Sequence, residues 1–176
     1  LLAEKTLTRC RIPLDGAARV SNPLSQDWTI LRPSLLPGLL ANALTNVNHG
    51  AEQVRLFEVG KTYVRAGDSL EETLHISGVL FGKAAAPHWR AGGRSTDFYD
   101  AKGLVADLAR GLAGLEWLPL DAPASGKTDS DPLFHPKASL RLKLPRGVFG
   151  TVGALHPTVA RAWGLDKEKP VLFDLR

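Results

Sequence analysis

The fold is decided by residues 34–64, which read SLLPGLLANALTNVNHGAEQVRLFEVGKTYV. From 35 to 47, apolar residues recur at the three- and four-residue spacing of a helix that buries one broad face. Ser34 is a candidate N-cap, Pro37 falls in the first turn, where a missing N–H is harmless, and Gly50 suits a left-handed helix stop. The sequence therefore predicts a leucine-rich helix followed directly by strands.

Strand-like segments dominate the rest of the chain, because they are rich in β-branched and aromatic residues and bounded by turn-forming residues. A second helix is predicted to begin at Asp97, a good N-cap, and to end at Gly114, and a short helix is predicted from Pro157 to Trp163. We expect strands at 54–59, 61–64, 74–81, 116–120, 139–144, 148–155 and 171–175.

The order of these elements predicts an α+β fold with a mostly antiparallel sheet, because helices flank hairpins instead of alternating with strands. In the segment 139–144 the leucines alternate with Ser139, Arg141 and Lys143, which predicts a half-buried strand whose polar residues face solvent. Residues 1–20 give no clear pattern and are not placed.

Length and composition are those of an ordinary globular domain. The 176 residues are 44% hydrophobic and 23% charged, which excludes intrinsic disorder and favours a single core. The formal net charge of +4 falls well short of a dedicated polyanion binder. No apolar run approaches the roughly 20 residues that span a bilayer, so we expect no membrane association. The single cysteine, Cys10, excludes an internal disulfide and favours a reducing compartment, the cytoplasm.

No motif in the sequence carries a recognisable catalytic chemistry. The segment 78–83 comes closest to a phosphate loop, but it has one residue too few between its glycines and an alanine after the lysine. No two of the five histidines have the spacing of paired metal ligands. For His135 and His156, each followed by proline, we expect hydrogen bonds to backbone groups at turns, and whether they meet in space stays open. We therefore expect no catalytic, cofactor-binding or metal-ligating residue.

Direct RNA binding has some support. Arg141, Lys143 and Arg146 are close in sequence, and Trp89 lies between His88 and Arg90, a mixture that stacks on bases. Against this, basic residues are spread through the chain and interleaved with acidic ones. The sequence therefore favours no direct contact with RNA.

Several motifs resemble the core of the bacterial phenylalanyl-tRNA synthetase β subunit. Each is weak alone, but together they follow the family's order over roughly residues 20–175. They are Asn22-Pro23-Leu24-Ser25, LRPSLLPGLL at 31–40, LFEVG at 56–60, His88-Trp89, DFYDAKG at 97–103, His135-Pro136 and GTVGALHP at 150–157.

The resemblance implies a class II synthetase-like domain, an antiparallel sheet flanked by helices, over residues 21–176. Residues 1–20 are then a lead-in truncated from a longer chain. The resemblance also implies that the β copy is catalytically silent, whereas the α subunit binds ATP and phenylalanine and two αβ pairs form an α2β2 tetramer. ATP, magnesium and tRNA would then belong to the cytoplasmic holoenzyme, a phenylalanine–tRNA ligase, and the isolated fragment is predicted to be inactive.

The resemblance implies that one residue accounts for the expected lack of catalytic activity. In the catalytic homologue, the strand equivalent to 60–64 ends in an arginine that holds the ATP phosphate, and the resemblance implies that Val64 stands at this place. Arg65 is adjacent, but one step along a strand turns a side chain to the other face. An isopropyl group cannot stabilise the charge that develops at the phosphate.

A silent domain can still support its partner chain. We consider Arg32, Leu35, Leu36, Leu39, Leu40, Phe57 and Glu58 as subunit-interface or structural residues, since obligate interfaces resemble a core cut in half. The alternative is that the leucines only cover this domain's own sheet.

Two other functions are kept open. One is a stand-alone synthetase-like paralogue that binds RNA or a protein without an α partner. The other is an active amino-acid-activating enzyme, which would catalyse amino-acid-dependent pyrophosphate exchange. The fold by itself does not separate them.

Overall fold

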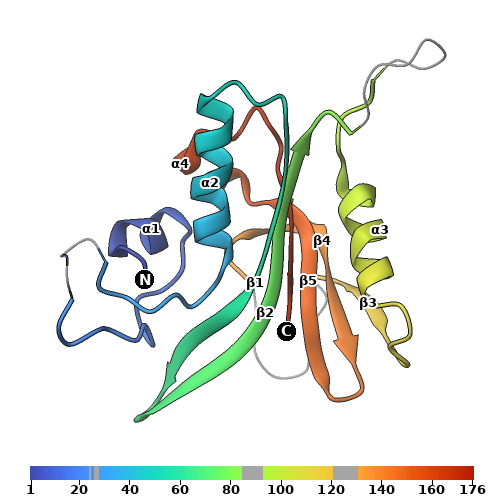
Figure 1. The fold of residues 1–176 in the computed structure, drawn as a ribbon. Helices are drawn as coiled ribbons and strands as arrows, with labels where there is room; N and C mark the ends of the chain where they lie inside the picture. Colours follow the sequence, from blue (N-terminus) through green and yellow to red (C-terminus); the bar gives the residue numbers. More distant parts are fainter. Residues whose placement is uncertain (24, 26–27, 85–92, 121–130) are drawn as a thin grey trace.

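The chain forms one six-stranded sheet with helices on both faces (Figure 1). The computed structural model describes residues 1–23, 25, 28–84, 93–120 and 131–176. The sheet order is β1-β2-β6-β5-β4-β3 and all neighbours are antiparallel, which confirms the predicted α+β class. The strands are β1 (Gln53–Ala66), β2 (Ser69–Gly82), β3 (Glu116–Pro119), β4 (Phe134–Leu144), β5 (Gly147–Leu155) and β6 (Val171–Leu175).

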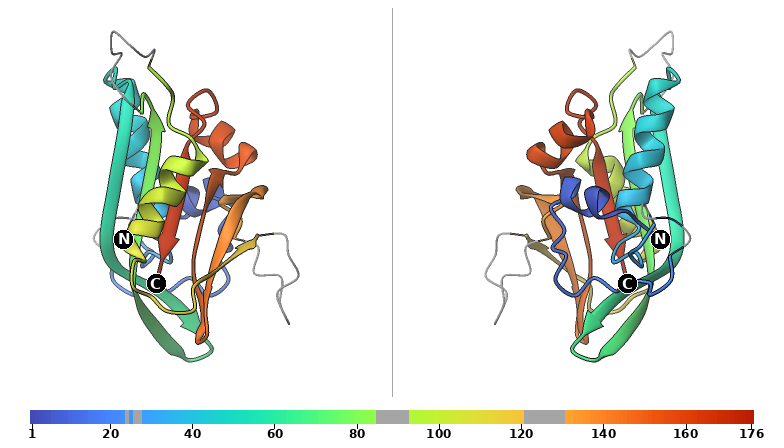
Figure 2. Two further views of the ribbon diagram at one scale, coloured as in Figure 1. Left: turned by 90° about the vertical axis from the view of Figure 1, so that its right-hand side faces the viewer. Right: turned by 90° about the vertical axis from the view of Figure 1, so that its left-hand side faces the viewer.

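Helices α1 (Glu4–Arg9), α2 (Leu36–Asn48) and α4 (Pro157–Trp163) lie on one face of the sheet, and α3 (Phe98–Leu108) lies on the other (Figures 1 and 2). We call these the α2 face and the α3 face. Each face has its own hydrophobic cluster, one centred on the leucines of α2 and one on the buried residues of α3. On the α3 face, α3 packs against β5 and β6 and leaves β1 and the outer part of β2 uncovered.

Helix ends follow the predicted local signals. Asp97 caps α3, accepting from the N–H groups of Tyr99 and Asp100 in a capping box, as predicted. Gly50 has the predicted left-handed backbone, with φ of 83°. Helix α2 begins later than expected, at Leu36, and the Ser34 hydroxyl accepts a hydrogen bond from the Leu36 N–H at 3.2 Å. Helix α3 ends at Leu108, several residues before the predicted stop.

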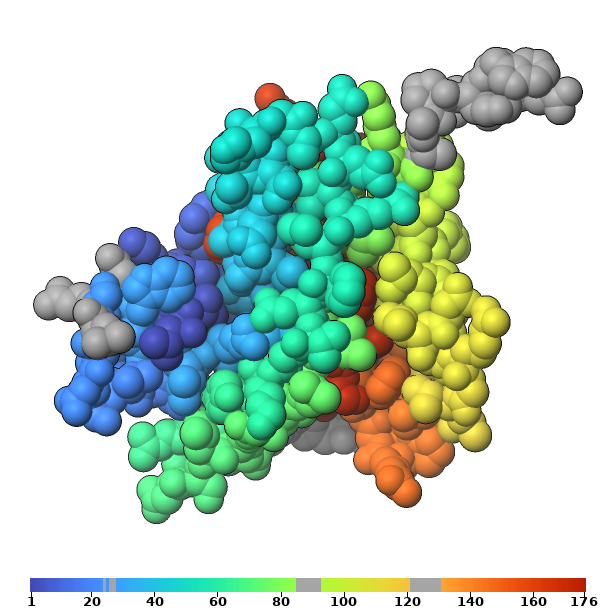
Figure 3. Space-filling view, viewed as in Figure 1, coloured from blue at the N-terminus to red at the C-terminus, as the bar shows by residue number. Residues whose placement is uncertain are grey.

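The β1–β2 hairpin is longer than the sequence suggested. The two expected runs in β1 form one strand of 14 residues that pairs with β2 throughout, from Gln53 opposite Gly82 to Ala66 opposite Ser69. The polar outer half of β2 was not predicted from the sequence, because its side chains are exposed and do not alternate in hydrophobicity. Its tip projects from the body of the molecule (Figure 3, green, lower left).

Among the elements of the described residues, helix α1 is the one with no counterpart in the sequence prediction. It packs against α4, where the Arg9 guanidinium donates two hydrogen bonds to the Ala162 carbonyl and lies 4.0 Å from the centroid of a ring of Trp163. Leu7 and Cys10 are fully buried. Contacts far along the chain thus hold a helix of only six residues, which is too short to be stable alone.

The prediction for the polar residues of β4 is wrong in two of three cases. Lys143 is exposed, but Ser139 and Arg141 are buried, Arg141 with 5% of its surface exposed. Both point to the α2 face, beside Thr151 and Gly153 of β5. Gly153 leaves the room for this, since a Cβ there would lie 1.9 Å from the Ser139 hydroxyl. Alternation shows which residues share a face, and only the assembled sheet shows that both faces are covered.

Candidate functional site

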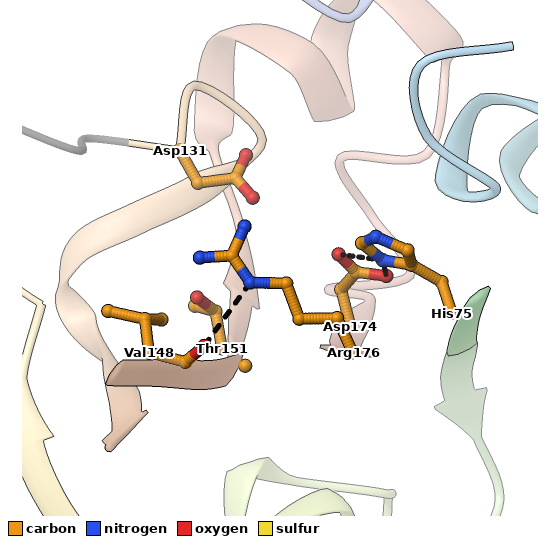
Figure 4. Close-up of a pocket in the computed structure, with 7 residues that line it drawn as sticks. His75, Asp131, Val148, Thr151, Asp174 and Arg176 are labelled. Atoms are coloured by element: carbon orange, nitrogen blue, oxygen red, sulfur yellow. Dashed lines mark hydrogen bonds and ion pairs between the residues drawn. The ribbon is translucent and has the colours of Figure 1, made fainter. Parts of the chain in front are cut away.

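The α2 face carries two adjoining cavities near the end of β6, of about 390 and 250 Å³. Four polar residues line both cavities: His75, Asp131, Asp174 and Arg176 (Figure 4). They come from β2, the segment before β4, the strand β6 and the residue that follows it. The α2 face is apolar beneath the helices and polar here, so this is where the sheet can meet a ligand.

Asp174 is the centre of the polar cluster. Both of its carboxylate oxygens lie 3.0 Å from Nδ1 of His75, and its Oδ1 accepts a hydrogen bond from the Ser77 hydroxyl. The register of the sheet explains this, since Asp174 pairs with Ser77 on one side and with Thr151 on the other. A half-buried carboxylate with three hydrogen-bond contacts is well satisfied, which gives it a structural role in joining β6 to β2.

Arg176 brings a guanidinium into the cluster. Its backbone N–H donates to the Phe149 carbonyl at 2.8 Å, and its Nε donates to the Val148 carbonyl at 3.2 Å. In the view of Figure 4, one terminal nitrogen of the guanidinium points toward the carboxylate of Asp131 and the other points to the side. Arg176 was not among the residues predicted from the sequence, because nothing near it in the chain forms a recognisable motif.

Asp131 has an unusual protonation equilibrium. Its Oδ1 accepts a hydrogen bond from the Leu133 N–H at 3.0 Å. Burial, with a smaller contribution from the negative charge of Asp174, raises the pKa of Asp131 from 3.8 to about 6. The folded chain therefore holds this proton more tightly than the unfolded chain does.

This pKa makes stability depend on pH. Because the folded pKa is the higher one, the unfolding free energy falls as pH rises from about 4 through about 6. Asp131→Asn keeps the acceptor for Leu133 and removes the charge, so it should flatten this fall. Above pH 6 the variant should be more stable by on the order of 2 kcal/mol. Urea unfolding of both chains across this window measures the difference, and parallel curves would contradict the assignment.

Val64 lines the larger of the two cavities, on the same face as Thr62. Its side chain is partly open to solvent, with 43% exposed. Arg65 lies on the opposite face, and its Nε donates to the Gly67 carbonyl at 3.1 Å. The guanidinium beside Val64 in the sequence is therefore turned away from the cavity.

The charges around Val64 are mostly negative. The carboxylates that line the larger cavity are Glu71, Asp131 and Asp174, against the single guanidinium of Arg176 and the imidazole of His75. Among the described residues there is also no group of three His, Cys, Asp or Glu side chains that could hold a metal ion. A polyphosphate placed here would meet like charge without a bridging cation.

Arg32 and Glu58 form one structural unit with Gly60. The Arg32 guanidinium pairs with the Glu58 carboxylate, and its Nε donates to the Lys61 carbonyl at 2.9 Å. A Cβ on Gly60 would lie 2.4 Å from Nη2 of Arg32, so a larger residue there would displace the guanidinium from its place across β1. The Arg32 carbonyl also accepts from the Tyr63 N–H at 2.9 Å. These motif residues hold the N-terminal segment against β1.

The candidate interface residues separate into two groups. Leu35, Leu36, Leu39 and Leu40 are all buried within this chain, Leu36, Leu39 and Leu40 in the hydrophobic cluster of the α2 face. For these leucines the structure favours the alternative that they cover the domain's own sheet. Phe57 is different, because it lies on the uncovered part of the α3 face with 73% of its surface exposed.

The two histidines that precede prolines do meet, with their ring centroids 6.4 Å apart. Each has the structural role predicted for it: Nδ1 of His135 accepts from the Lys137 N–H, and Nδ1 of His156 accepts from the Thr158 N–H.

Of the basic residues considered for RNA binding, Arg141 is buried. Residues 88–90 lie outside the described residues. Among the described helices, none is long and apolar enough to cross a membrane.

Comparison with known proteins identifies one family. The family model for the phenylalanyl tRNA synthetase beta chain CLM domain matches residues 1–176. Phenylalanine--tRNA ligase beta subunits from Novosphingobium aromaticivorans, Xanthomonas oryzae pv. oryzae and Chromobacterium violaceum are 41%, 34% and 30% identical, over 86%, 92% and 92% of this chain. The chain spans only about a fifth of the length of these relatives.

A solved structure has the same fold. Desulfitobacterium hafniense PylSc, a pyrrolysyl tRNA synthetase, superimposes with a TM-score of 0.62 over 99% of this chain and 56% of that chain. The sequence identity is 14%, so this likeness concerns the fold alone.

Proposed function

The chain belongs to the phenylalanyl-tRNA synthetase β-chain family, and from this premise we propose that it is a catalytically silent domain of a cytoplasmic phenylalanine–tRNA ligase. In this proposal the α subunit binds ATP, magnesium and phenylalanine, and the domain supports that subunit within an α2β2 assembly that charges tRNA. Residues 21–176 contain the whole class II-like sheet, and residues 1–20 lead into it.

The observation that carries the proposal is the character of the cavity beside Val64. Adenylate formation develops negative charge on phosphate and needs cations placed to meet it. Here an isopropyl group stands at the proposed phosphate position, Arg65 is turned to the other face, and carboxylates outnumber guanidinium groups. The residues around the cavity support the proposal that this domain has kept the synthetase fold and lost its nucleotide site.

The supporting role is assigned to the uncovered part of the α3 face. We define the β1–β2 apolar patch as Phe57, Val59, Leu70 and Leu74, which all point to this face and are all more than half exposed. Exposed apolar groups gathered on one sheet face are typical of a protein interface. The name β subunit, which the relatives carry, implies a second chain, and we assign the patch to the α chain.

Pyrophosphate exchange tests the proposal that this domain has no catalytic activity of its own. The 176-residue chain alone is expected to show no phenylalanine-dependent exchange between pyrophosphate and ATP. The assembled ligase should show it, and should keep it when His75→Gln and Asp131→Asn alter the cavity of this domain. Exchange by the isolated chain, or its loss from the assembled ligase in both variants, would contradict the proposal.

A further inference from the structure

Arg11, His135 and His156 come together from three elements where α1 and α4 pack. Besides the close approach of the two imidazoles, Nη1 of Arg11 lies 3.0 Å from Nε2 and 3.2 Å from Nδ1 of His156. Arg11 follows Cys10, the C-cap residue of α1, and has a left-handed backbone with φ of 59°. The next residue, Ile12, donates its N–H to the Leu7 carbonyl, which fixes this turn.

Backbone hydrogen bonds determine which ring nitrogens are free. Nδ1 of His135 lies 3.1 Å from the Lys137 nitrogen, and Nδ1 of His156 lies 3.2 Å from the Thr158 nitrogen. A nitrogen that accepts a hydrogen bond carries no proton, so each neutral ring has its proton on Nε2. Both Nε2 atoms are donors, and the guanidinium of Arg11 has donors only.

The cluster therefore collects donors and positive charge without an acceptor. The one lone pair on Nδ1 of His156 already accepts the hydrogen bond from the Thr158 N–H. The 3.0 Å approach of Arg11 to Nε2 therefore brings two hydrogen-bond donors together. Burial and then the charges of Arg11 and His135 lower the pKa of His156. In the described part of the chain, no ion pair joins any of these three residues to a carboxylate.

We propose that Arg11, His135 and His156 form a binding site for a phosphate group. A tetrahedral oxyanion offers several acceptor oxygens at once, so it can satisfy the guanidinium and both Nε2–H groups together. Arg11 is exposed and the two histidines are half-buried, so the donors can be reached from solvent. The phosphate can belong to a free phosphate compound or to the backbone of an RNA.

Titration of the 176-residue chain with inorganic phosphate tests the site. Nitrogen-15 NMR of the imidazole rings should show saturable shifts at His135 and His156, with a rise in the pKa of His156, because the anion stabilises its protonated form. His49 and His75 are internal references: the first bonds to the Thr45 carbonyl and the second to Asp174. Equal shifts at all four rings, or the same shifts with chloride at matched ionic strength, would overturn the proposal.

Two variants separate binding from folding. Arg11→Gln should weaken phosphate binding about ten-fold or more, since it removes a charge-assisted hydrogen bond. His156→Asn should do the same while keeping a good N-cap for α4. Arg146→Gln is the matched charge control, because Arg146 is exposed in the β4–β5 turn at the opposite end of these strands. An unchanged His75 signal reports an intact fold, and wild-type affinity in Arg11→Gln would refute the site.

The source of the phosphate is decided in the assembled ligase. If the site holds an RNA phosphate, Arg11→Gln should lower the salt dependence of tRNA binding by about one counterion, and Arg146→Gln should not. An unchanged salt dependence together with saturable phosphate binding assigns the site to a free phosphate compound. The phosphate titration does not depend on the proposed ligase function, so the two can fail separately.

Discussion

Phe57→Asp combined with Val59→Asp is expected to abolish capture of the α chain while leaving this domain folded. Both side chains lie on the uncovered part of the α3 face, and 73% and 54% of their surfaces are exposed. Aspartate there would have to be desolvated in an interface, and losing a central aromatic anchor alone weakens binding about 10- to 100-fold. Co-purification of the full β chain with its α subunit measures the effect.

The control for this experiment is Leu14→Asp, which places a carboxylate on another exposed leucine outside the β1–β2 apolar patch. It should leave capture unchanged. Circular dichroism should show native secondary structure in both proteins, because the substituted side chains make few contacts within the chain. Full capture by a folded double variant would remove the β1–β2 apolar patch as the docking surface and with it the proposed mode of support.

Leu40→Asp is expected to prevent folding of the domain. Leu40 is fully buried in the cluster of the α2 face, beneath which Val54 and Val79 pack from the sheet. An unpaired carboxylate there has no hydrogen-bond partner and costs about 5 kcal/mol or more, a large part of the stability of a typical domain. Urea unfolding and expression level report the loss.

Asn42→Asp is the matched control, because it places the same carboxylate on an exposed position of the same helix. Its unfolding free energy should stay within about 0.5 kcal/mol of the parent chain. A folded, stable Leu40→Asp chain would show that α2 is not anchored as described. A loss of α capture in Leu40→Asp would follow from unfolding, so capture by this variant does not distinguish the two roles considered for the leucine-rich helix.

Local signals in the sequence were sufficient for most of the fold. Asp97 and Gly50 act on backbone groups within a few residues of themselves, so capping and chain reversal can be predicted from neighbours. Strand β6 and helix α4 were found with the bounds that the structure has, because their apolar periodicity is strong. The family was found in the same way, since short motifs in a fixed order survive in the sequence itself.

The candidate site could not be predicted from such local signals. His75, Asp131, Asp174 and Arg176 come from segments as much as about 100 residues apart in the chain, and only the sheet register places them side by side. The pairing of His135 with His156 likewise depends on the register of β4 and β5, and the approach of Arg11 to His156 depends on how α1 packs against α4. No spacing in the chain encodes these distances.

The sequence by itself thus determined most of the elements, the antiparallel class and the family, because propensity, capping and periodicity act over a few residues. The tertiary structure alone decided which leucines are internal, that Arg141 is buried, and that Phe57 stays exposed. Burial depends on what covers a face, and the covering element is brought there by contacts distant in the chain. For that reason the proposed docking surface and the phosphate site emerge only from the folded molecule.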